Sequence, residues 1–395
     1  MIESHEQVPA SVFLRRNRSR VRLVDTTLRD GAQAPGVVFS TKEKCRLASA
    51  LDAAGIAEIE AGIPAADART ASDIRALVDL GLRARLTGWC RLRSEDLVAA
   101  AACGLTAVHL SLPASKRLCA AFHHDPAWWR NQLAELVPQA CAAFRYVSIG
   151  LQDIGGAVVE EAADLARLAV VAGAHRIRLA DSNGALLPRR VGQIVTELRT
   201  HVPGTEWGFH AHNDLGLATA NTLAAFEAGA THLDVTINGL GERAGNARLA
   251  EVAAILRFAI ECDPGIDLRA LPELSQFVAQ AARRHVPPDA PLVGRDVFLH
   301  TSGLHCAART SDTSVYQVCP PEAIGRSAQP PVIVGVQSGR HVLAAALQAL
   351  AQSPTPAELE ALLPRVHAAA REHKRELRNG ELLALYEDIR QNSGR

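Results

Sequence analysis

The feature that most constrains the fold is a regular alternation of short apolar runs with longer amphipathic stretches, beginning at Val21. Such alternation is typical of strand–helix units that build a parallel sheet. The expected strands are Val21–Thr27, Glu58–Gly62, Ala84–Cys90, Ala107–Pro113, Tyr146–Asp153, Arg176–Asp181, Trp207–His212 and His232–Gly239. The expected helices are Lys42–Ala54, Asp67–Leu80, Glu95–Cys103, Pro126–Phe144, Val158–Gly173, Pro188–His201, Leu217–Ala228 and Ala247–Glu261. Eight repeats over about 240 residues predict a (β/α)8 TIM barrel, which is an α/β fold.

An open, doubly wound sheet is the alternative fold. Its dinucleotide-binding form has a Gly-x-Gly-x-x-Gly turn after the first strand, and the sequence has no such turn there. The alternation stops near Asp263 and gives way to Pro-rich segments and Ala- and Leu-rich helical patterns, which predict a C-terminal, mostly helical appendage. The expected organisation is a flexible basic arm at residues 1–20, a TIM-barrel catalytic domain at 21–263, and a linker with a helical subdomain at 264–395.

The composition limits the kinds of partner. The chain has 395 residues, with 42 basic and 42 acidic side chains, so its formal net charge is zero. A neutral chain lacks the positive field that binds nucleic acid or an anionic membrane surface. We recognise no apolar stretch of membrane-spanning length and no signal peptide. We therefore expect a cytoplasmic protein that acts on small molecules, with its eight scattered cysteines kept as reduced thiols.

A cluster of polar side chains is expected at the carboxyl ends of the strands, where TIM barrels carry their functional residues. His210 and His212 are two positions apart on the seventh strand, so both imidazoles point the same way. Asp30 follows the first strand, which a single strand separates from the seventh around a closed barrel. One carboxylate and two imidazoles can bind a divalent metal, and Mg2+, Mn2+ and Zn2+ all remain open. Asn246 is a candidate further ligand. A metal with open positions can bind a 2-oxo acid through its ketone oxygen, and Arg29 is a candidate cation for the negative charge that develops there.

Three segments carry a resemblance to a known family. Asp25–Gly31, His210–Asp214 and Gly239–Asn246 are similar to the signatures of the 2-isopropylmalate, homocitrate and citramalate synthases, a group of metal-dependent TIM barrels. The resemblance extends over roughly residues 21–345. Three further segments resemble the homocitrate synthases associated with nitrogenase cofactor assembly: Gln33–Ser40, Ile59–Pro64 and Trp89–Arg91.

The resemblance implies an activity and a set of site residues. It implies a Claisen-type condensation of acetyl-CoA, the co-substrate, with a 2-oxo acid, followed by hydrolysis of the thioester. The expected acceptor is 2-oxoglutarate, which gives homocitrate, and the expected assembly is a homodimer. Matching the motifs residue by residue implies catalytic positions at Arg29, Gln152, His305 and Tyr316, and substrate contacts at Gln33, Glu60, Arg91 and Ser182.

The chain departs from the pattern of these synthases at several positions. Gln152 stands where they have a Glu, and Gly156 stands where they have an Arg. A Gln side chain can hydrogen-bond but cannot take up a proton at neutral pH. Ala307 and Ala308 replace the Asp-Gly that usually follows the catalytic histidine, and Val336 replaces a Lys. The expected metal site is therefore complete, while the surrounding acid–base and specificity residues are changed.

These departures leave other functions open. If Gly156 makes room for another acceptor, the protein would carry out the same reaction on a different 2-oxo acid. If Gln152 replaces an essential base, the protein would be a catalytically impaired relative that acts as a binding or regulatory subunit. A retro-aldol or thioester lyase is a further alternative, because the wider group of metal-dependent barrels includes such enzymes.

Overall fold

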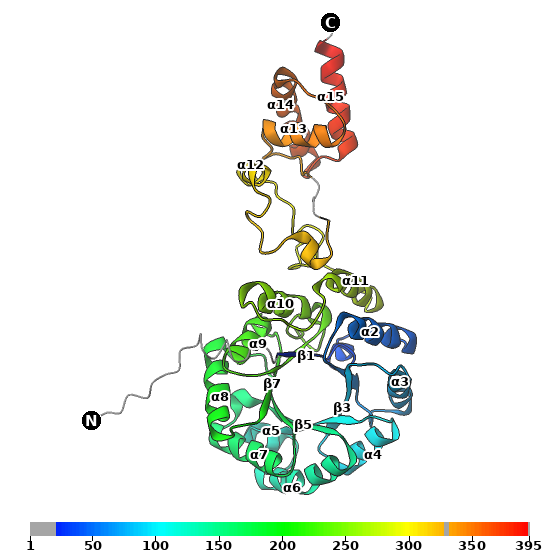
Figure 1. Ribbon diagram of the computed structural model, residues 1–395, viewed down its shortest axis with the longest axis vertical. Coiled ribbons are helices and arrows are strands. Elements are labelled where there is room, and N and C mark those ends of the chain that lie inside the picture. Colours follow the sequence, from blue (N-terminus) through cyan, green and yellow to red (C-terminus); the bar gives the residue numbers. More distant parts are fainter. Residues whose placement is uncertain (1–20, 328–331, 394–395) are drawn as a thin grey trace, which may run out of the picture. The chain divides into compact units, whose positions relative to one another are not determined.

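The computed structural model describes residues 21–327 and 332–393. Its sheet is a closed barrel of eight parallel strands that follow one another in sequence order, so the predicted TIM barrel is confirmed (Figure 1). The strands are β1 (Arg22–Asp25), β2 (Glu58–Gly62), β3 (Arg85–Arg91), β4 (Ala107–Pro113), β5 (Tyr146–Gln152), β6 (Arg176–Asp181), β7 (Glu206–Ala211) and β8 (His232–Val235). The barrel closes because β8 pairs with β1 in register from Arg22 opposite His232 to Asp25 opposite Val235.

Helices form a ring around the barrel (Figure 1). They are α2 (Thr41–Ala54), α3 (Ala68–Val78), α4 (Ser94–Ala102), α5 (Lys116–Ala121), α6 (Pro126–Ala143), α7 (Val159–Val171), α8 (Pro188–His201), α9 (Ala218–Glu227), α10 (Leu249–Ala254) and α11 (Leu271–Ala281). Local chemistry sets several of their ends. Ser40 and Glu43 form a capping box at the start of α2, and Gly55 ends it in the left-handed region with φ +99°. A Cβ at Gly55 would lie 2.6 Å from the Gly265 carbonyl oxygen, so this chain reversal requires glycine.

The first and last strands end earlier than predicted. β1 stops at Asp25 because its carboxylate accepts hydrogen bonds from the Thr27 amide and hydroxyl, which turns the chain. β8 stops at Val235 and is followed by a 3-10 turn, Ile237–Gly239, in which Asn238 has φ +59°. The residues that were expected to extend these strands therefore form loops at the carboxyl end of the barrel, where they can carry site residues.

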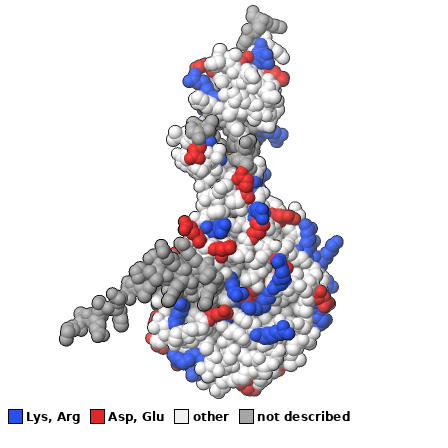
Figure 2. All heavy atoms as spheres, viewed as in Figure 1, with Lys and Arg blue, Asp and Glu red and all other residues white. Residues whose placement is uncertain are grey.

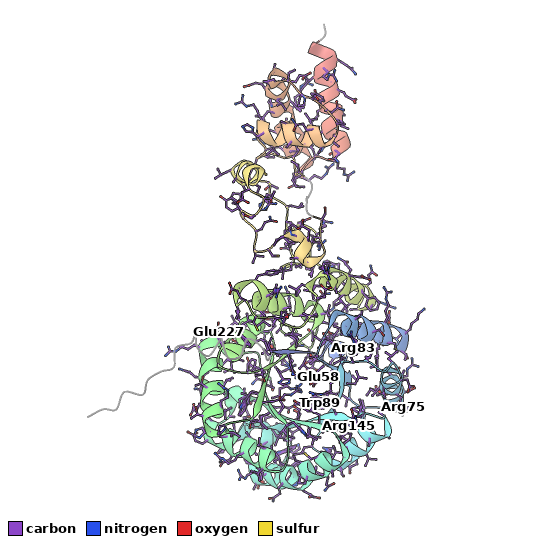
Figure 3. All side chains as sticks on the ribbon, viewed as in Figure 1. Glu58, Arg75, Arg83, Trp89, Arg145 and Glu227 are labelled. Carbon is purple, nitrogen blue, oxygen red and sulfur yellow. The ribbon has the colours of Figure 1, made fainter. Side chains whose placement is uncertain are left out.

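The interior of the barrel is polar, although the interiors of such barrels are usually filled with branched apolar side chains. Arg176 donates two hydrogen bonds to Glu58 across the barrel, at 2.8 and 3.0 Å, and both side chains are buried. Burial alone raises the pKa of Glu58, but the Arg176 charge and hydrogen bonds outweigh it and lower the pKa to about 2. Figure 3 places Glu58 and Trp89 inside the ring of strands and Arg75 on an outer helix.

The chain divides into two compact units, and each is described here by itself. The first comprises the barrel with its helices as far as Val286, together with Pro291–Val293. It extends past residue 263, the predicted end of the barrel domain, because α11 packs on α2. The predicted boundaries at residues 20 and 263 otherwise stay predictions, and the basic arm at residues 1–20 lies outside the described residues.

The second unit comprises Pro287–Ala290 and the chain from Gly294. Its helices are α12 (Gly303–Ser311), α13 (Arg340–Ala349), α14 (Pro356–His373) and α15 (Asn379–Ser393), with a 3-10 turn at Pro321–Ile324. Buried Leu343, Leu347, Leu362 and Tyr386 form its core. The predicted helical appendage is therefore present, with an apolar core of its own.

The surface of the first unit mixes both signs of charge, and Figure 2 shows acidic and basic side chains together on its visible face. This distribution agrees with the zero net charge of the sequence. Within residues 21–327 and 332–393, no helix combines the length and the apolar character that crossing a membrane requires.

We expect the Glu58–Arg176 pair to be important for barrel stability. Arg176→Met should lower the free energy of unfolding by about 3–5 kcal/mol, because it leaves a buried carboxylate without its main partner. Arg83→Met is the control, since the Arg83 side chain is 78% exposed and its ion pair should contribute less than about 1 kcal/mol. Urea titration followed by tryptophan fluorescence measures this, because all four tryptophans lie in the first unit. Equal losses in the two variants would contradict the expectation.

The same pair should make the barrel sensitive to acid. Because folding lowers the pKa of Glu58 from 4.5 to about 2, its contribution to stability is present above pH 4.5 and disappears as the pH falls towards 2. Urea midpoints measured across this range should fall for the wild type. They should fall less steeply for the double variant Glu58→Gln/Arg176→Met, which lacks the group that titrates. Identical slopes would show that other carboxylates govern the acid transition.

Candidate active site

Asp30, His210 and His212 lie together at the carboxyl end of the barrel, with ligand atoms that are all within 4.8 Å of one another. His210 Nε2 is 3.0 Å and His212 Nε2 is 3.8 Å from Asp30 Oδ2. His210 is in β7, His212 follows it, and Asp30 lies in the loop after β1, so the three converge because β8 alone separates these strands. All three side chains are buried.

The atoms around this trio fit a divalent metal. Asp234 Oδ2 lies 3.0 Å from His210 Nδ1, which leaves Nε2 facing Asp30. Carboxylates commonly hold metal-binding histidines in this way. Asp30 Oδ1, His212 Nδ1 and Asn246 Oδ1 are buried without a hydrogen-bond partner among the described residues. Such atoms are costly unless a ligand or ion satisfies them, and the mixed oxygen and nitrogen donors suit Mg2+, Mn2+ or Zn2+.

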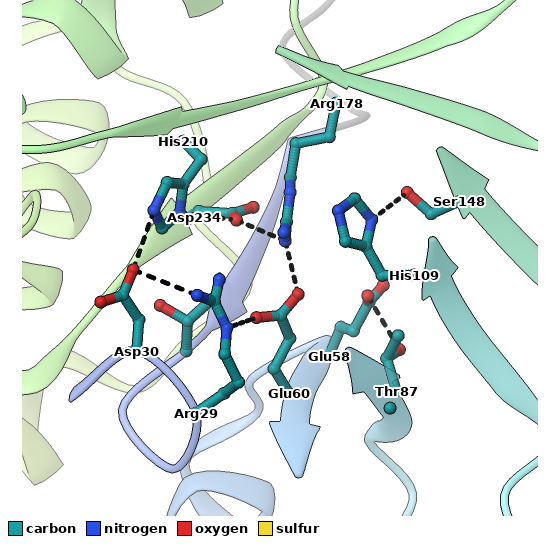
Figure 4. A network of polar contacts seen from close by, with 12 residues as sticks. Arg29, Asp30, Glu58, Glu60, Thr87, His109, Ser148, Arg178, His210 and Asp234 are labelled. Carbon is teal, nitrogen blue, oxygen red and sulfur yellow. Dashed lines mark hydrogen bonds and ion pairs between the residues drawn. The ribbon is translucent and has the colours of Figure 1, made fainter. Parts of the chain in front are cut away.

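Two members of the trio, Asp30 and His210, belong to a closed ring of charged groups (Figure 4). Arg29 Nε donates to Glu60 Oε2 at 2.7 Å, and its Nη1 is 3.3 Å from Asp30 Oδ2. Arg178 Nη1 donates to Glu60 at 2.5 Å and to Asp234 at 2.7 Å. In order, the ring contains Arg29, Glu60, Arg178, Asp234, His210 and Asp30. Every carboxylate in it lies between positive or hydrogen-bonding neighbours, which fixes the position of each group.

The ring controls the protonation of the trio. Burial alone raises the pKa of Asp30, but the charge of Arg29 and the bond from His210 outweigh it and hold that pKa well below its usual range. Burial alone lowers the pKa of His210, but Asp234 and Asp30 outweigh it and raise that pKa. Burial and the neighbouring His210 lower the pKa of His212 to about 4. At neutral pH Asp30 is therefore ionised and His212 is neutral, as metal ligands must be.

A cavity of about 390 Å3 opens beside the trio. Among the residues predicted from the sequence, it is lined by Arg29, Asp30, Gln33, Gln152, Ser182, His210 and His212. Ser182 Oγ also accepts a hydrogen bond from the Asp153 amide. Glu60 is buried behind Arg29 and does not line the cavity. Arg91 does not line it either, because its guanidinium is bound to Asp96.

His305 and Tyr316 belong to the second unit. Their rings stack with centroids 4.0 Å apart and an interplanar angle of 22°. Tyr316 has φ +57° and is 56% exposed. The catalytic roles expected for these two residues stay predictions.

Three central residues were missed by the sequence analysis: Asp234, Arg178 and His109. Each lies in the middle of a strand and faces the barrel interior. A pattern in the sequence could have indicated them. In each of these strands, two polar side chains stand two positions apart among apolar residues, and the pairs are His232 and Asp234, Arg176 and Arg178, and His109 and Ser111.

Comparison with known proteins identifies the family. The family model described as HMGL-like matches residues 20–278. The chain belongs to the HMGL-like family. A second model, described as homocitrate synthase post-HMGL domain-like, matches residues 292–374. Apart from Leu292 and Val293, the residues of this second match lie in the second unit.

Curated relatives of this HMGL-like chain are similar over most of its length. A 2-isopropylmalate synthase from Caldanaerobacter subterraneus is 37% identical over 370 residues, 93% of this chain and 96% of that protein. A homocitrate synthase from a Frankia species is 39% identical, covering 92% of this chain and 89% of that protein. A 2-phosphonomethylmalate synthase from Streptomyces rubellomurinus is 39% identical, covering 88% and 91%.

Solved structures agree on the fold of this HMGL-like chain. An HMG-CoA lyase from Brucella melitensis superposes with a TM-score of 0.60 at 20% identity, covering 67% of this chain and 99% of that one. One from Pseudomonas aeruginosa gives 0.60 at 22% identity, covering 68% and 94%. The chain is thus a TIM-barrel member of the HMGL-like family whose curated relatives include homocitrate, isopropylmalate and phosphonomethylmalate synthases.

We expect the trio to bind one divalent ion with an affinity that depends on Asp234. Calorimetric titration of chelator-treated protein with Mn2+ or Zn2+ should give one site for the wild type and none for Asp30→Asn. Asp234→Asn should weaken binding about 10- to 100-fold, because it removes the group that orients His210. Glu227→Gln, at an exposed position on α9, is the control and should bind as the wild type does.

The same titration should depend on pH. Because the pKa of His210 is raised, protons compete with the metal there, and affinity should fall as the pH falls through that pKa. An affinity that does not change with pH, or an unaltered Asp234→Asn variant, would contradict the assigned ligands.

Proposed function

We propose that this protein condenses the acetyl group of acetyl-CoA with a 2-oxo acid and hydrolyses the resulting thioester. The observation that carries the proposal is the Asp30–His210–His212 trio beside Arg29 in one cavity, in a chain similar to synthases over more than 85% of its length. The relatives are named for different products, which supports a common chemistry and leaves the acceptor open. The first acceptor to test is 2-oxoglutarate.

The proposed chemistry places charge where the reaction needs it. A divalent metal bound by Asp30, His210 and His212 would act as a Lewis acid on the ketone of the acceptor. Arg29 is held by Glu60 and Asp30, so it presents a fixed cation to negative charge that develops on the ketone oxygen. Ser182 and Gln33 supply neutral hydrogen-bonding groups for the acceptor carboxylate.

The proton transfers fall to other groups. A base removes a proton from the acetyl methyl group, the methyl carbon bonds to the ketone carbon, and the ketone oxygen takes up a proton. Water then cleaves the thioester and releases the CoA thiol. Gln152 lines the cavity but cannot accept a proton at neutral pH. We assign the base to His305 and a supporting hydroxyl to Tyr316 on the resemblance to the synthases, which implies catalytic positions at these two residues. The proposal includes a homodimer and a cytoplasmic location, and light scattering of the purified protein tests the first.

Gln152 also favours a second candidate function, a catalytically impaired subunit that binds and regulates. It lines the cavity at a position where the resemblance to the synthases implies a Glu. The two candidates differ in one measurable property, which is turnover by the unmodified protein.

We expect metal-dependent thiol release from acetyl-CoA with at least one 2-oxo acid. The measurement incubates the protein with Mn2+, acetyl-CoA and 2-oxoglutarate, pyruvate, 2-oxoisovalerate or phosphonopyruvate, and follows free thiol. Arg29→Gln should lower kcat by on the order of 100- to 1,000-fold, because it removes a donor aimed at the developing oxyanion. Arg69→Gln, whose side chain is 73% exposed, should not change kcat. No thiol release with any acid would exclude the proposal.

A second prediction separates the two candidates. If Gln152 is a neutral member of a working site, Gln152→Glu should change kcat less than tenfold, because the base lies elsewhere. If the protein is an impaired subunit, wild-type turnover should be near zero and Gln152→Glu should raise it. The comparison uses the same thiol assay on both proteins.

A further inference from the structure

The cavity has a second wall, formed by β4, β5 and β6, that the metal trio does not use. Ser111, Gly150, Gln152, Ala180 and Ser182 line it, and none of them is charged. Arg178, also on β6, lines the same cavity and lies between His109 and His210 in Figure 4. Its Nη1 is bonded to both Glu60 and Asp234, so its charge is already shared with the ring around the metal trio.

His109 is an unsatisfied polar group in this wall. Its side chain is fully buried and adjoins the cavity. Nδ1 lies 3.0 Å from Ser148 Oγ, while Nε2 has no hydrogen-bond partner among the described residues. A buried nitrogen without a partner is unfavourable, and a bound ligand that accepts its hydrogen bond can recover that cost.

Gly150 keeps space open beside this nitrogen. A Cβ at position 150 would lie 2.4 Å from His109 Nε2 and 3.1 Å from Ser111 Oγ. Any other residue would therefore press on both polar atoms and close the gap between them. The backbone of Gly150 is an ordinary strand, so its turn geometry does not require glycine.

The neighbouring hydrogen bonds favour one tautomer of His109. Arg176 Nε can only donate, and it donates to Ser148 Oγ at 3.0 Å. The Ser148 hydroxyl proton then has His109 Nδ1 as its acceptor among the described residues. The opposite tautomer would leave the Ser148 hydroxyl proton without an acceptor among the described residues, so these bonds favour a His109 ring with its proton on Nε2. Burial and the nearby Arg178 and Arg176 lower the pKa of His109 well below its usual value, so the ring is neutral.

We propose that His109 Nε2–H and Ser111 Oγ–H bind the far end of the 2-oxo acid, and that this end carries a hydrogen-bond-accepting oxygen. The inference rests on the proposed function and adds the class of acceptor. An aliphatic end would leave both donors unpaired in the occupied cavity. Sites built around a substrate's hydrogen bonds discriminate strongly against analogues that lack them. The oxygen can belong to a carboxylate or to a neutral group, and the experiment separates these two sources.

The test compares three acids of similar length. 2-Oxohexanoate has an aliphatic end, 4-methoxy-2-oxobutanoate replaces one of its methylenes by an ether oxygen, and 2-oxoglutarate has a carboxylate there. We expect kcat/KM to be at least tenfold higher for one or both oxygen-bearing acids than for 2-oxohexanoate. The ether and the carboxylate then show whether a neutral or a charged end is preferred. A preference for 2-oxohexanoate would overturn the inference.

Variants connect the preference to the two donors. His109→Leu and Ser111→Ala should each lower kcat/KM for the preferred oxygen-bearing acid about 10- to 100-fold and change that for 2-oxohexanoate less than threefold. His109→Gln should retain most of the preference, because its amide nitrogen reaches the position of Nε2. His201→Phe and Ser72→Ala, at exposed positions on α8 and α3, are matched controls. Equal losses for all acids in both variants would mean a structural role and overturn the inference.

Two further measurements do not depend on turnover. Calorimetry on the Mn2+-loaded protein without acetyl-CoA measures binding of the same acids, so the preference is tested even if no thiol is released. Nitrogen-15 NMR of labelled histidines, with His109→Gln to assign the signal, should show the Nε2-protonated tautomer of His109. Ser148→Ala should alter that signal. An Nδ1-protonated His109, or equal binding of the three acids, would overturn the inference while leaving the proposed function intact.

Discussion

The functional end of this barrel depends on one closed ring of ion pairs, in which Arg29 and Arg178 alternate with the carboxylates of Glu60, Asp234 and Asp30 and with His210. Three carboxylates and two guanidinium groups give the ring a net charge of −1 when His210 is neutral. Two opposite charges compensate one another inside a protein only when their geometry is fixed. This ring can therefore accommodate a divalent cation. The cation would replace the proton that His210 shares with Asp30 and Asp234, so it would not be an isolated buried charge.

The barrel can hold so many charges because successive side chains of a strand point to opposite faces of the sheet. Alternate side chains of β7 and β8 point outward, where Phe209, Leu233 and Val235 are buried against the helices. The inward positions are then free to be polar. Deeper in the same barrel, Glu58 and Arg176 form a second layer that supports Ser148 and, through it, His109. Apolar packing outside the sheet thus supplies stability while the interior supplies chemistry.

The sequence predicts those features of the fold and the site that depend on a local pattern of residues. β2, β4 and β6 have the predicted bounds because apolar runs and turn residues define them, and the Asp30–His210–His212 trio follows from a two-residue spacing and the strand order. The partners of His109 and Arg178 were not predictable in this way. Ser148 is 39 positions from His109 and meets it from the neighbouring strand β5, and Glu60 is 118 positions from Arg178 and meets it across the barrel. Arg91 shows the reverse case. The resemblance of Trp89–Arg91 to the homocitrate synthases implied a substrate contact for Arg91, but Asp96, five residues later, binds its guanidinium.

The separation of the charge ring from the second wall explains how such a site can change its acceptor. Ser111, Gly150 and Gln152 line the cavity but form no part of the ring, so none of the ring's ion pairs depends on their side chains. Relatives named for three different products are all 37–39% identical to this chain, so overall identity does not report the acceptor. Under the proposal above, the side chains of the wall would determine the acceptor, because they would meet the part of a 2-oxo acid that differs from one acceptor to the next. In this chain Gly150 leaves space beside His109, whose Nε2 has no hydrogen-bond partner among the described residues, and the proposed acceptor would fill that space and accept a hydrogen bond from this nitrogen.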